Sequence, residues 1–282
     1  MIAVLFTAGN FGSTIEYCLR QFSQELAKVD AEVLPDGSMH GFQKELHPTM
    51  LSQWKNIDQA QIITPVFPNQ DYLSGRECIE WYRTALANRK VILIDSANQS
   101  QAERCQLFAY YKIPTLLDAV MKDKAQSWNP AYGHWRHMEK WELREALSFY
   151  IDQQSDLVDM ARYATDNWLV VSPQSILDDL PGQVRCMLDF CGLTYNGDSI
   201  DAFYQKWLVK QQYILQEAET VELILRAIEN NTIIEWQPLS TVGEAIVQSR
   251  LRRIGYKLDM PGLDVLPCDS NRLIACFLAN RS

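Results

Sequence analysis

The amino-acid sequence predicts an α/β protein with a mostly parallel central sheet flanked by helices. Short apolar runs recur along the first two thirds of the chain, and each lies near a stretch whose apolar residues have helical spacing. This alternation is typical of parallel strands that are covered by helices on both faces. The runs are Ile2–Phe6, Gln61–Val66, Lys90–Asp95 and Trp168–Ser172.

Helices are expected between these runs and after the last of them. Apolar residues at spacings of three and four indicate a helix that begins near Ile15, with Ser13 or Thr14 as its N-cap. Residues 123–134 are predicted to form a loop over the edge of the sheet, and a strand and a helix are expected from Leu263 onward. The other helical stretches are Leu73–Asn88, Lys140–Tyr163, Ser199–Asn230 and Val242–Ile254.

The character of the sequence changes near residue 195. The alternation of strand and helix patterns ends there, and the remainder is mostly helical in its spacing. We therefore expect an α/β core over residues 1–195 and a mainly helical extension over residues 196–282, packed together as a single structural unit. With 282 residues, of which 47% are hydrophobic, the chain is long enough to bury the core of such a protein.

Composition and charge argue against several classes of protein. No apolar stretch approaches the roughly 20 residues that span a bilayer. The N-terminus enters a strand without a basic leader, so we expect a soluble, cytoplasmic protein with no membrane partner. The net charge of −9 argues against a nucleic-acid partner but allows a local basic pocket. Seven cysteines without a CxxC pair indicate reduced thiols, and no metal site is predicted.

The strongest functional signal lies between the first apolar run and the first helix. Here the sequence of residues 7–14 is Thr-Ala-Gly-Asn-Phe-Gly-Ser-Thr. Glycines let a backbone turn sharply and approach a ligand closely, and hydroxyls together with the N–H groups of a helix N-terminus favour an anion. We therefore expect a nucleotide-type ligand at this loop. The residues expected to bind it are Gly9, Asn10, Phe11, Gly12, Ser13 and Thr14.

The loop departs from the nucleotide triphosphatase pattern. That pattern, GxxxxGK[ST], requires a lysine after its second glycine, whereas Ser13 follows Gly12 here. A standard ATPase or GTPase is therefore disfavoured. The segment can also be interpreted as a glycine-containing strand-to-helix turn that binds no ligand, and the sequence of the loop alone leaves this alternative open.

Several segments match, in order along the chain, the motifs of one enzyme family. Residues 9–15 read Gly-Asn-Phe-Gly-Ser-Thr-Ile, residues 38–40 read Ser-Met-His, and residues 61–71 carry an apolar strand followed by Pro-Asn-Gln-Asp. Residues 132–141 read Tyr-Gly-His-Trp-Arg-His-Met-Glu-Lys-Trp, and residues 169–193 add a strand, a turn and a closing Cys-Gly-Leu. Together these segments resemble the sulfotransferase family. That family has a P-loop-like fold and transfers a sulfuryl group from 3′-phosphoadenosine 5′-phosphosulfate to a hydroxyl or an amine.

The resemblance implies roles for the residues of the first loop. Residues 9–15 are similar to the family's Pro-Lys-Ser-Gly-Thr-Thr-Trp, so Ser13 and Thr14 would hold the 5′-phosphate. Asn10 replaces the family's lysine, and its amide would hydrogen-bond the bridging or sulfuryl oxygens. The replacement removes a full charge from the leaving-group side, and a neutral donor is about half as strong as a charged one.

The resemblance also implies roles for residues beyond the loop. His40 corresponds to the family's catalytic base. The arginine of the family's second strand has no counterpart here, so 3′-phosphate recognition would pass to Ser74 and Arg76. The family's C-terminal Arg-Lys-Gly clamp is missing as a motif. The arginines at positions 250, 252 and 253 could supply equivalent charge, although basic residues at the end of an amphipathic helix are a common structural feature.

Three functional hypotheses follow from the sequence. The first is a sulfotransferase-like enzyme with a small-molecule or carbohydrate-like acceptor. The second is a catalytically degenerate member of this fold that acts as a binding or assembly module, which the missing lysine and arginine favour. The third is a nucleotide-dependent kinase or hydrolase of the wider P-loop class, which the missing lysine disfavours. The sequence carries no specific signature of the acceptor or of the oligomeric state.

Overall fold

The computed structural model describes ten segments of the 282-residue chain, and the contacts between residues divide the chain into two compact units. The first unit combines residues 1–100 with residues 157–211, and the second combines residues 101–156 with residues 212–282. The boundary expected near residue 195 stays a prediction. The described segments are residues 1–7, 9–30, 45–46, 54, 57–67, 75–95, 101–121, 130–153, 160–230 and 239–253.

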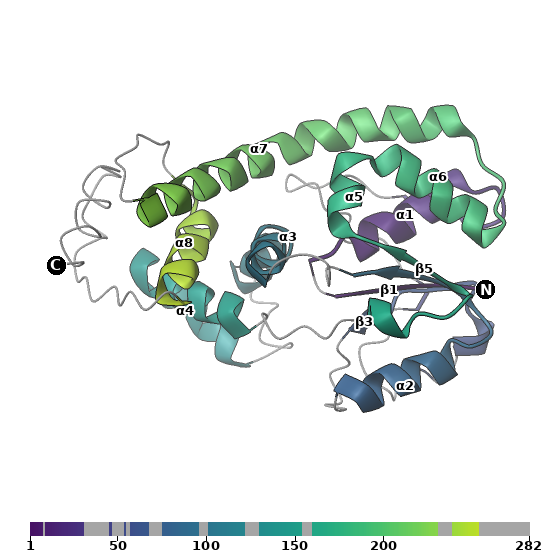
Figure 1. The fold of residues 1–282 in the computed structure, drawn as a ribbon, viewed down its shortest axis with the longest axis horizontal. Helices are drawn as coiled ribbons and strands as arrows, with labels where there is room; N and C mark the ends of the chain where they lie inside the picture. Colours follow the sequence, from purple (N-terminus) through teal and green to yellow (C-terminus); the bar gives the residue numbers. More distant parts are fainter. Residues whose placement is uncertain are drawn as a thin grey trace. The chain divides into compact units, whose positions relative to one another are not determined.

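The first unit is built on an all-parallel sheet (Figure 1). Its central strand, β1 (Ile2–Thr7), pairs with β4 (Lys90–Ile94) along one edge. Along its other edge it pairs with β2 (Ile62–Ile63) and then with β3 (Val66–Phe67). The outer strand β5 (Trp168–Val171) pairs with β4, which gives the strand order β2-β1-β4-β5. The predicted α/β class with a parallel sheet is confirmed.

The second apolar run forms two short strands instead of the single expected strand. Pro65 lies between β2 and β3 and has no N–H group to donate to a neighbouring strand. The N–H of Thr64, on the side away from β1, donates to the carbonyl oxygen of Leu46 at 2.9 Å. Only the carbonyl of Pro65 stays in the ladder, where it accepts from the N–H of Phe6 at 3.3 Å.

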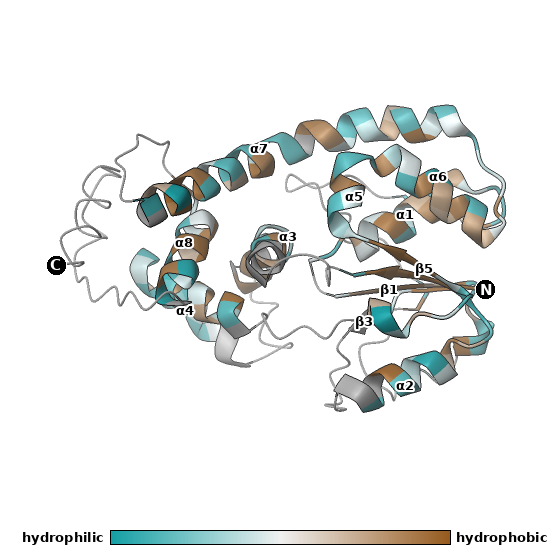
Figure 2. Ribbon diagram, in the orientation of Figure 1, coloured by the Kyte–Doolittle hydropathy of each residue, from teal (hydrophilic) through white to brown (hydrophobic). Residues whose placement is uncertain are grey.

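Alternate residues of the central strands pack against helices on opposite faces of the sheet. Ala3, Leu5, Val91 and Leu93 belong to a buried cluster that includes residues of α2 (Gly75–Ala85). Figure 1 shows α2 on one side of the sheet and the helices α1 and α6 on the other, and the strands are strongly hydrophobic in Figure 2. All six residues of β1 are buried, which explains why its sequence is continuously apolar rather than alternating.

The helices of the opposite face are α1 (Gly12–Phe22) and α6 (Leu180–Cys191). The short helix α5 (Pro173–Asp178) precedes α6, and both begin with a side-chain cap that the sequence analysis did not predict. Ser172 Oγ accepts from the N–H of Ser175 at 3.0 Å, and Asp179 Oδ1 accepts from the N–H of Gly182 at 2.9 Å. Such caps satisfy N–H groups of a first helical turn.

A buried arginine joins the amino ends of the strands. Arg89 is 3% exposed, and its guanidinium donates to the carbonyl oxygens of Ile2 at 3.2 Å, of Ala60 at 3.1 Å and of Ile57. Burial lowers the pKa of Arg89, and the charge of Asp58 opposes this shift. Because three separate backbone carbonyls depend on this one side chain, Arg89 fixes the edge of the sheet opposite to the first loop.

The second unit consists of helices. It contains α3 (Gln101–Met121), the 3-10 helix η3 (Pro130–His137), α4 (Lys140–Gln153), α8 (Thr241–Arg253) and the C-terminal half of α7. The sequence analysis did not predict α3, and it expected a loop where η3 begins. The helix expected over Lys140–Tyr163 ends at Gln153. The long helix α7 runs over Gly197–Asn230, close to the expected bounds.

A polar seam joins α4 to α8, and three of its pairs share a sequence offset of 104 residues. Lys140 Nζ lies 3.0 Å from Glu244 Oε1, and Arg144 Nε donates to Gln248 Oε1 at 3.0 Å. One further turn along, Arg252 donates to Ser148 Oγ and pairs with Asp152, which also accepts from Ser249 Oγ at 2.6 Å. A constant offset of 104 residues means that the two helices run parallel and in register.

We expect Arg89→Met to destabilise the protein by about 3 kcal/mol or more. The substitution keeps apolar volume but removes the side-chain donor from the carbonyl groups of Ile2, Ile57 and Ala60, and a buried polar group that loses its partner costs about 1–3 kcal/mol. The free energy of unfolding in urea measures the effect. Arg83→Met, at an exposed position of α2, is the matched control and should change stability by less than about 0.5 kcal/mol. Equal unfolding midpoints for the two variants would contradict this role of Arg89.

We expect Asp152→Ala to destabilise the second unit by about 2 kcal/mol, because hydrogen bonds to charged groups contribute about 1.5–3 kcal/mol. Glu145→Ala removes an exposed carboxylate from the same helix and serves as the control. Urea unfolding at low salt and at 1 M salt measures both variants, and the difference should shrink at high salt because ions screen the partly exposed pair. An effect no larger than that of the control would show that the seam contributes little.

Candidate functional site

The strand order reverses direction at one place in the described sheet. From β1 the chain passes to β2 and β3 on one side, and it then crosses to β4 and continues outward to β5. In open parallel sheets, ligands bind outside the carboxyl ends of the strands at such a reversal. Here the reversal lies between the carboxyl ends of β1 and β4. The loop that the sequence singles out, residues 9–14, follows β1 and therefore borders this point.

The backbone of the loop alternates in the sign of φ. Gly9 has φ 88° and Phe11 has φ 59°, whereas Asn10 between them does not have a positive φ. Alternation in the sign of φ is a feature of anion-binding nests, and in this loop the N–H of Asn10 is already donated to the carbonyl oxygen of Thr7. The left-handed conformation is ordinary for glycine but costs a residue with a side chain about 1–3 kcal/mol. Phe11 is the one described non-glycine residue with positive φ.

The helix begins earlier than the sequence predicted. The expected N-cap at Ser13 or Thr14 is wrong, because α1 begins at Gly12 and its N-cap residue is Phe11. Phe11 makes no side-chain capping hydrogen bond, but its carbonyl oxygen accepts the N–H of Ile15 at 2.9 Å. The two hydroxyl residues therefore lie inside the first helical turn. The backbone N–H groups of a first turn have no carbonyl partner within the helix.

Gly12 is required by a close contact with the preceding strand. A Cβ atom added at Gly12 would lie 2.1 Å from Cδ1 of the Phe6 ring. Real Cβ atoms do not come this near to another carbon, so any side chain here would displace the ring or the helix. The absence of a side chain lets the first turn of α1 lie directly against the carboxyl end of β1.

The polar side chains of the loop are buried. Asn10 is 3% exposed, Ser13 is 9% exposed and Thr14 is 2% exposed. The side-chain amide of Asn10 donates to Thr7 Oγ1, and its backbone N–H donates to the carbonyl oxygen of Thr7 at 3.1 Å. Asn10, which the sequence resemblance aligns with a lysine of sulfotransferases, is thus turned back onto the end of β1.

The other predicted site residues are placed only in part. His40 and Ser74 lie outside the described residues. Arg76 occupies the first turn of α2, and its side chain is not described. Because α2 leads the chain from the end of β3 back to the start of β4, its first turn belongs to the same edge of the sheet as the loop.

One acidic residue at this edge was missed in the sequence analysis. Asp95 directly follows β4 and is 8% exposed. Ile94 is the register partner of Phe6, so Asp95 comes level with Thr7 at the end of the neighbouring strand. Its Oδ2 atom accepts from the N–H of Ala161 at 2.7 Å. The signal in the sequence was the acid at the end of the apolar run Lys90–Asp95.

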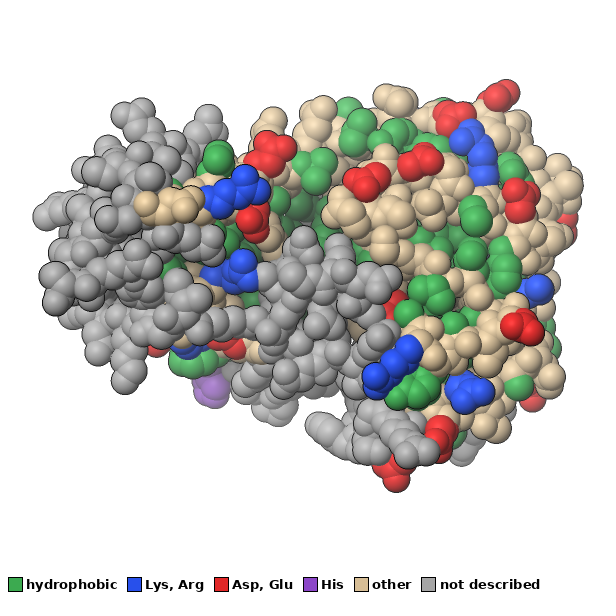
Figure 3. All heavy atoms as spheres, in the orientation of Figure 1, with side chains coloured by type: hydrophobic (Ala, Val, Ile, Leu, Met, Phe, Trp, Pro, Cys, Tyr) green, Lys and Arg blue, Asp and Glu red, His purple; other side chains and the backbone are tan. Residues whose placement is uncertain are grey.

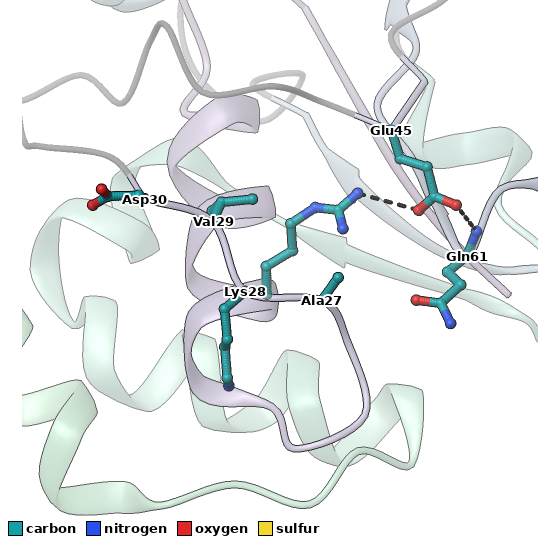
Figure 4. A pocket seen from close by; sticks show the side chains of 7 residues that line it. Ala27, Lys28, Val29, Asp30, Glu45 and Gln61 are labelled. Atoms are coloured by element: carbon teal, nitrogen blue, oxygen red, sulfur yellow. Dashed lines mark hydrogen bonds and ion pairs between the residues drawn. The ribbon is translucent and has the colours of Figure 1, made fainter.

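A groove of about 610 Å³ lies near the C-terminal end of α1 (Figure 4). At its centre Arg20 lies between Glu16, at 3.0 Å, and Glu45, at 3.2 Å. Glu45 in turn accepts from the N–H of Gln61 at 2.6 Å and from that of Ile62 at 3.0 Å. Since Gln61 directly precedes β2, this groove lies at the amino edge of the sheet, and its arginine serves an internal ion-pair network.

Among the arginines at positions 250, 252 and 253, which were considered as a substitute for a C-terminal clamp, Arg252 has a structural role. Arg252 is held by Asp152 and Ser148, and its guanidinium lies 3.8 Å from the centre of the Phe149 ring. These contacts belong to the seam between α4 and α8. The side chain of Arg253 is not among those described.

The described surface mixes charges of both signs. Lysines and arginines lie among aspartates and glutamates on the face drawn in Figure 3.

The described residues hold no group of three or more His, Cys, Asp or Glu side chains arranged to bind a metal ion. Within the same residues, no helix has the length and apolarity to cross a membrane. The cysteines described with their side chains, Cys18, Cys186 and Cys191, are free thiols.

Comparison of the chain with family models, with curated proteins and with solved structures gives no match. The relation to sulfotransferases therefore rests on the sequence motifs.

We expect Gly12→Ala to destabilise the first unit by about 1–3 kcal/mol, which is typical of an overpacked core. The matched control is Gly197→Ala, because the nearest side-chain atom to a Cβ at Gly197 lies 3.7 Å away, an ordinary contact. Thermal unfolding measures both variants. Gly12→Ala should cost less stability in a Phe6→Ala background than in the wild-type protein, since the atoms that clash are Cγ and the ring carbons of Phe6. An equal cost in both backgrounds would contradict the proposed cause.

Proposed function

We propose that this chain is a sulfotransferase-like enzyme. In this proposal, residues 9–14 bind the 5′-phosphate region of 3′-phosphoadenosine 5′-phosphosulfate, and the acceptor is a hydroxyl or an amine of a small or carbohydrate-like molecule. The observation that carries the proposal is the position of the loop. A glycine-containing turn with alternating φ leads into a helix at the point where the strand order reverses, and phosphate groups bind at such places.

The chemistry assigns one task to each group of the chain. The loop N–H groups and the hydroxyls of Ser13 and Thr14 hold the phosphate that becomes the leaving group. The acceptor atom attacks sulfur as the bond from sulfur to the bridging phosphate oxygen breaks, and His40 takes the acceptor's proton. Asn10 has a second amide N–H besides the one given to Thr7, and this N–H serves the bridging oxygen.

A second candidate is a degenerate member of the fold that binds the nucleotide but does not transfer the sulfuryl group. The buried contact between Asn10 and Thr7 favours this second candidate, because the loop has a neutral amide at the position where the enzymes have a catalytic cation. A neutral donor stabilises charge on a leaving oxygen about half as well as a charged one. The two candidates predict the same binding but different turnover.

We expect adenosine 3′,5′-bisphosphate at about 1 mM to raise the thermal unfolding midpoint of the purified protein. A ligand at about 100 times its Kd stabilises a protein by about 2.7 kcal/mol. Ser13→Ala and Thr14→Ala should each reduce the shift, and so should Arg76→Ala if the side chain binds the 3′-phosphate. Ser199→Ala is the matched control, since Ser199 is an exposed serine in the first turn of another helix, α7.

The outcomes separate the candidates. The enzyme is supported if the thermal shift depends on Ser13 and if an acceptor screen shows release of adenosine 3′,5′-bisphosphate from the sulfuryl donor. In that case His40→Ala should abolish the release of this product but not the binding of the nucleotide. Binding without release supports the degenerate module. ATP with magnesium is run in parallel because Asp95 places a carboxylate at the same edge, and a shift with ATP alone would favour a kinase or hydrolase. No shift with any nucleotide contradicts the proposal.

A further inference from the structure

The left-handed turn in the loop is held by a residue far away in the sequence. Phe11 is 7% exposed, and its ring meets that of Trp207 edge to face, with ring centroids 6.1 Å apart and planes at 70°. Trp207 belongs to the part of α7 that lies in the first unit and is fully buried. Trp207 also stacks on Tyr204, with ring centroids 6.2 Å apart. The indole thus has an aromatic contact within its own helix besides its contact with the loop.

The same helix contacts the body of α1 one turn earlier. Phe203 packs against Tyr17, with ring centroids 5.5 Å apart, and against Phe22, with ring centroids 5.6 Å apart. Phe203 and Trp207 are four residues apart, so they lie on one face of α7. Phe203 thus packs on the middle and the end of α1, whereas Trp207 packs on Phe11, the residue that precedes the first turn of α1.

We propose that Trp207 is a positioning residue of the phosphate loop, because its contact with Phe11 keeps the loop in the conformation that converges its N–H groups. This inference rests on the proposed function. A phenylalanine has no intrinsic preference for positive φ. Without the contact Phe11 would populate ordinary backbone conformations, and the apparent Kd rises as the binding-competent fraction falls.

The test compares two aromatic truncations on one helix. Titration calorimetry with adenosine 3′,5′-bisphosphate should show that Trp207→Leu weakens binding about tenfold, as expected when about one molecule in ten keeps the competent loop. Phe203→Leu also removes a ring, but the ring contacts described for Phe203 are with Tyr17 and Phe22 of α1, so its Kd should stay within about twofold of the wild-type value. Equal weakening by both variants would overturn the proposal.

A glycine at position 11 separates positioning from general stability. Phe11→Gly adopts positive φ without an aromatic anchor. In this background Trp207→Leu should change Kd less than about twofold, because the contact it removes is already absent. A full tenfold effect in the glycine background would mean that Trp207 acts by another route. If Trp207→Leu does not fold, Trp207→Phe takes its place and should give a smaller loss in the same direction.

Hydrogen exchange distinguishes failure of this inference from failure of the proposed function. Amides of the peptide over residues 9–15 should exchange several-fold faster in Trp207→Leu than in Phe203→Leu, whether or not a nucleotide binds. If the wild-type protein binds no nucleotide but the exchange rates differ in this way, the proposed function fails and the positioning role stands. If exchange over residues 9–15 is the same in both variants, the positioning role fails.

Discussion

The contact between Gly12 and the ring of Phe6 sets the geometry on which the first unit depends. It lets the first turn of α1 lie against the end of β1, so that strand, turn and helix follow one another within a few residues. The turn between them contains Gly9 and Phe11, both of which have positive φ. Positive φ is costly at Phe11, and the aromatic contact with Trp207 offsets this cost.

The two edges of the sheet use different chemistry. At the amino edge, buried cations organise the backbone: Arg89 binds three carbonyl oxygens, and Arg20 lies between two carboxylates. At the carboxyl edge, the loop after β1 is built from hydroxyl and amide groups, and Asn10 donates to Thr7. Buried charges need fixed partners, so the cations of the amino edge are committed to structure. The proposed ligand site thus lies at the edge whose described polar groups are mainly uncharged.

The sequence predicted the sheet well because parallel strands that are buried on both faces have continuously apolar sequences. The prediction was less accurate where a proline interrupts an apolar pattern. Pro65 divides the expected second strand into β2 and β3. Pro114 lies inside α3, a helix that the sequence pattern did not indicate. The loop was found from its glycines and hydroxyls. Its conformation was not, because a positive φ at Phe11 has no local cause and depends on Trp207, which is 196 positions away in the chain. Contacts of that range leave no periodic signal.

The neutral residue at position 10 changes how the proposed site would work. Position 10 is 3% exposed, and one N–H of the Asn10 side-chain amide donates to Thr7 Oγ1. Asparagine is therefore built into the turn, and the loop must attract a phosphate with N–H groups and hydroxyls alone. Neutral donors contribute less binding free energy than charged ones. They therefore bind an anion well only when they already point at it, since the cost of reorienting them would cancel much of that free energy. Under the proposed function, a loop without a cation depends on preorganisation of its backbone for affinity, and by our inference that preorganisation comes from Phe11 and Trp207.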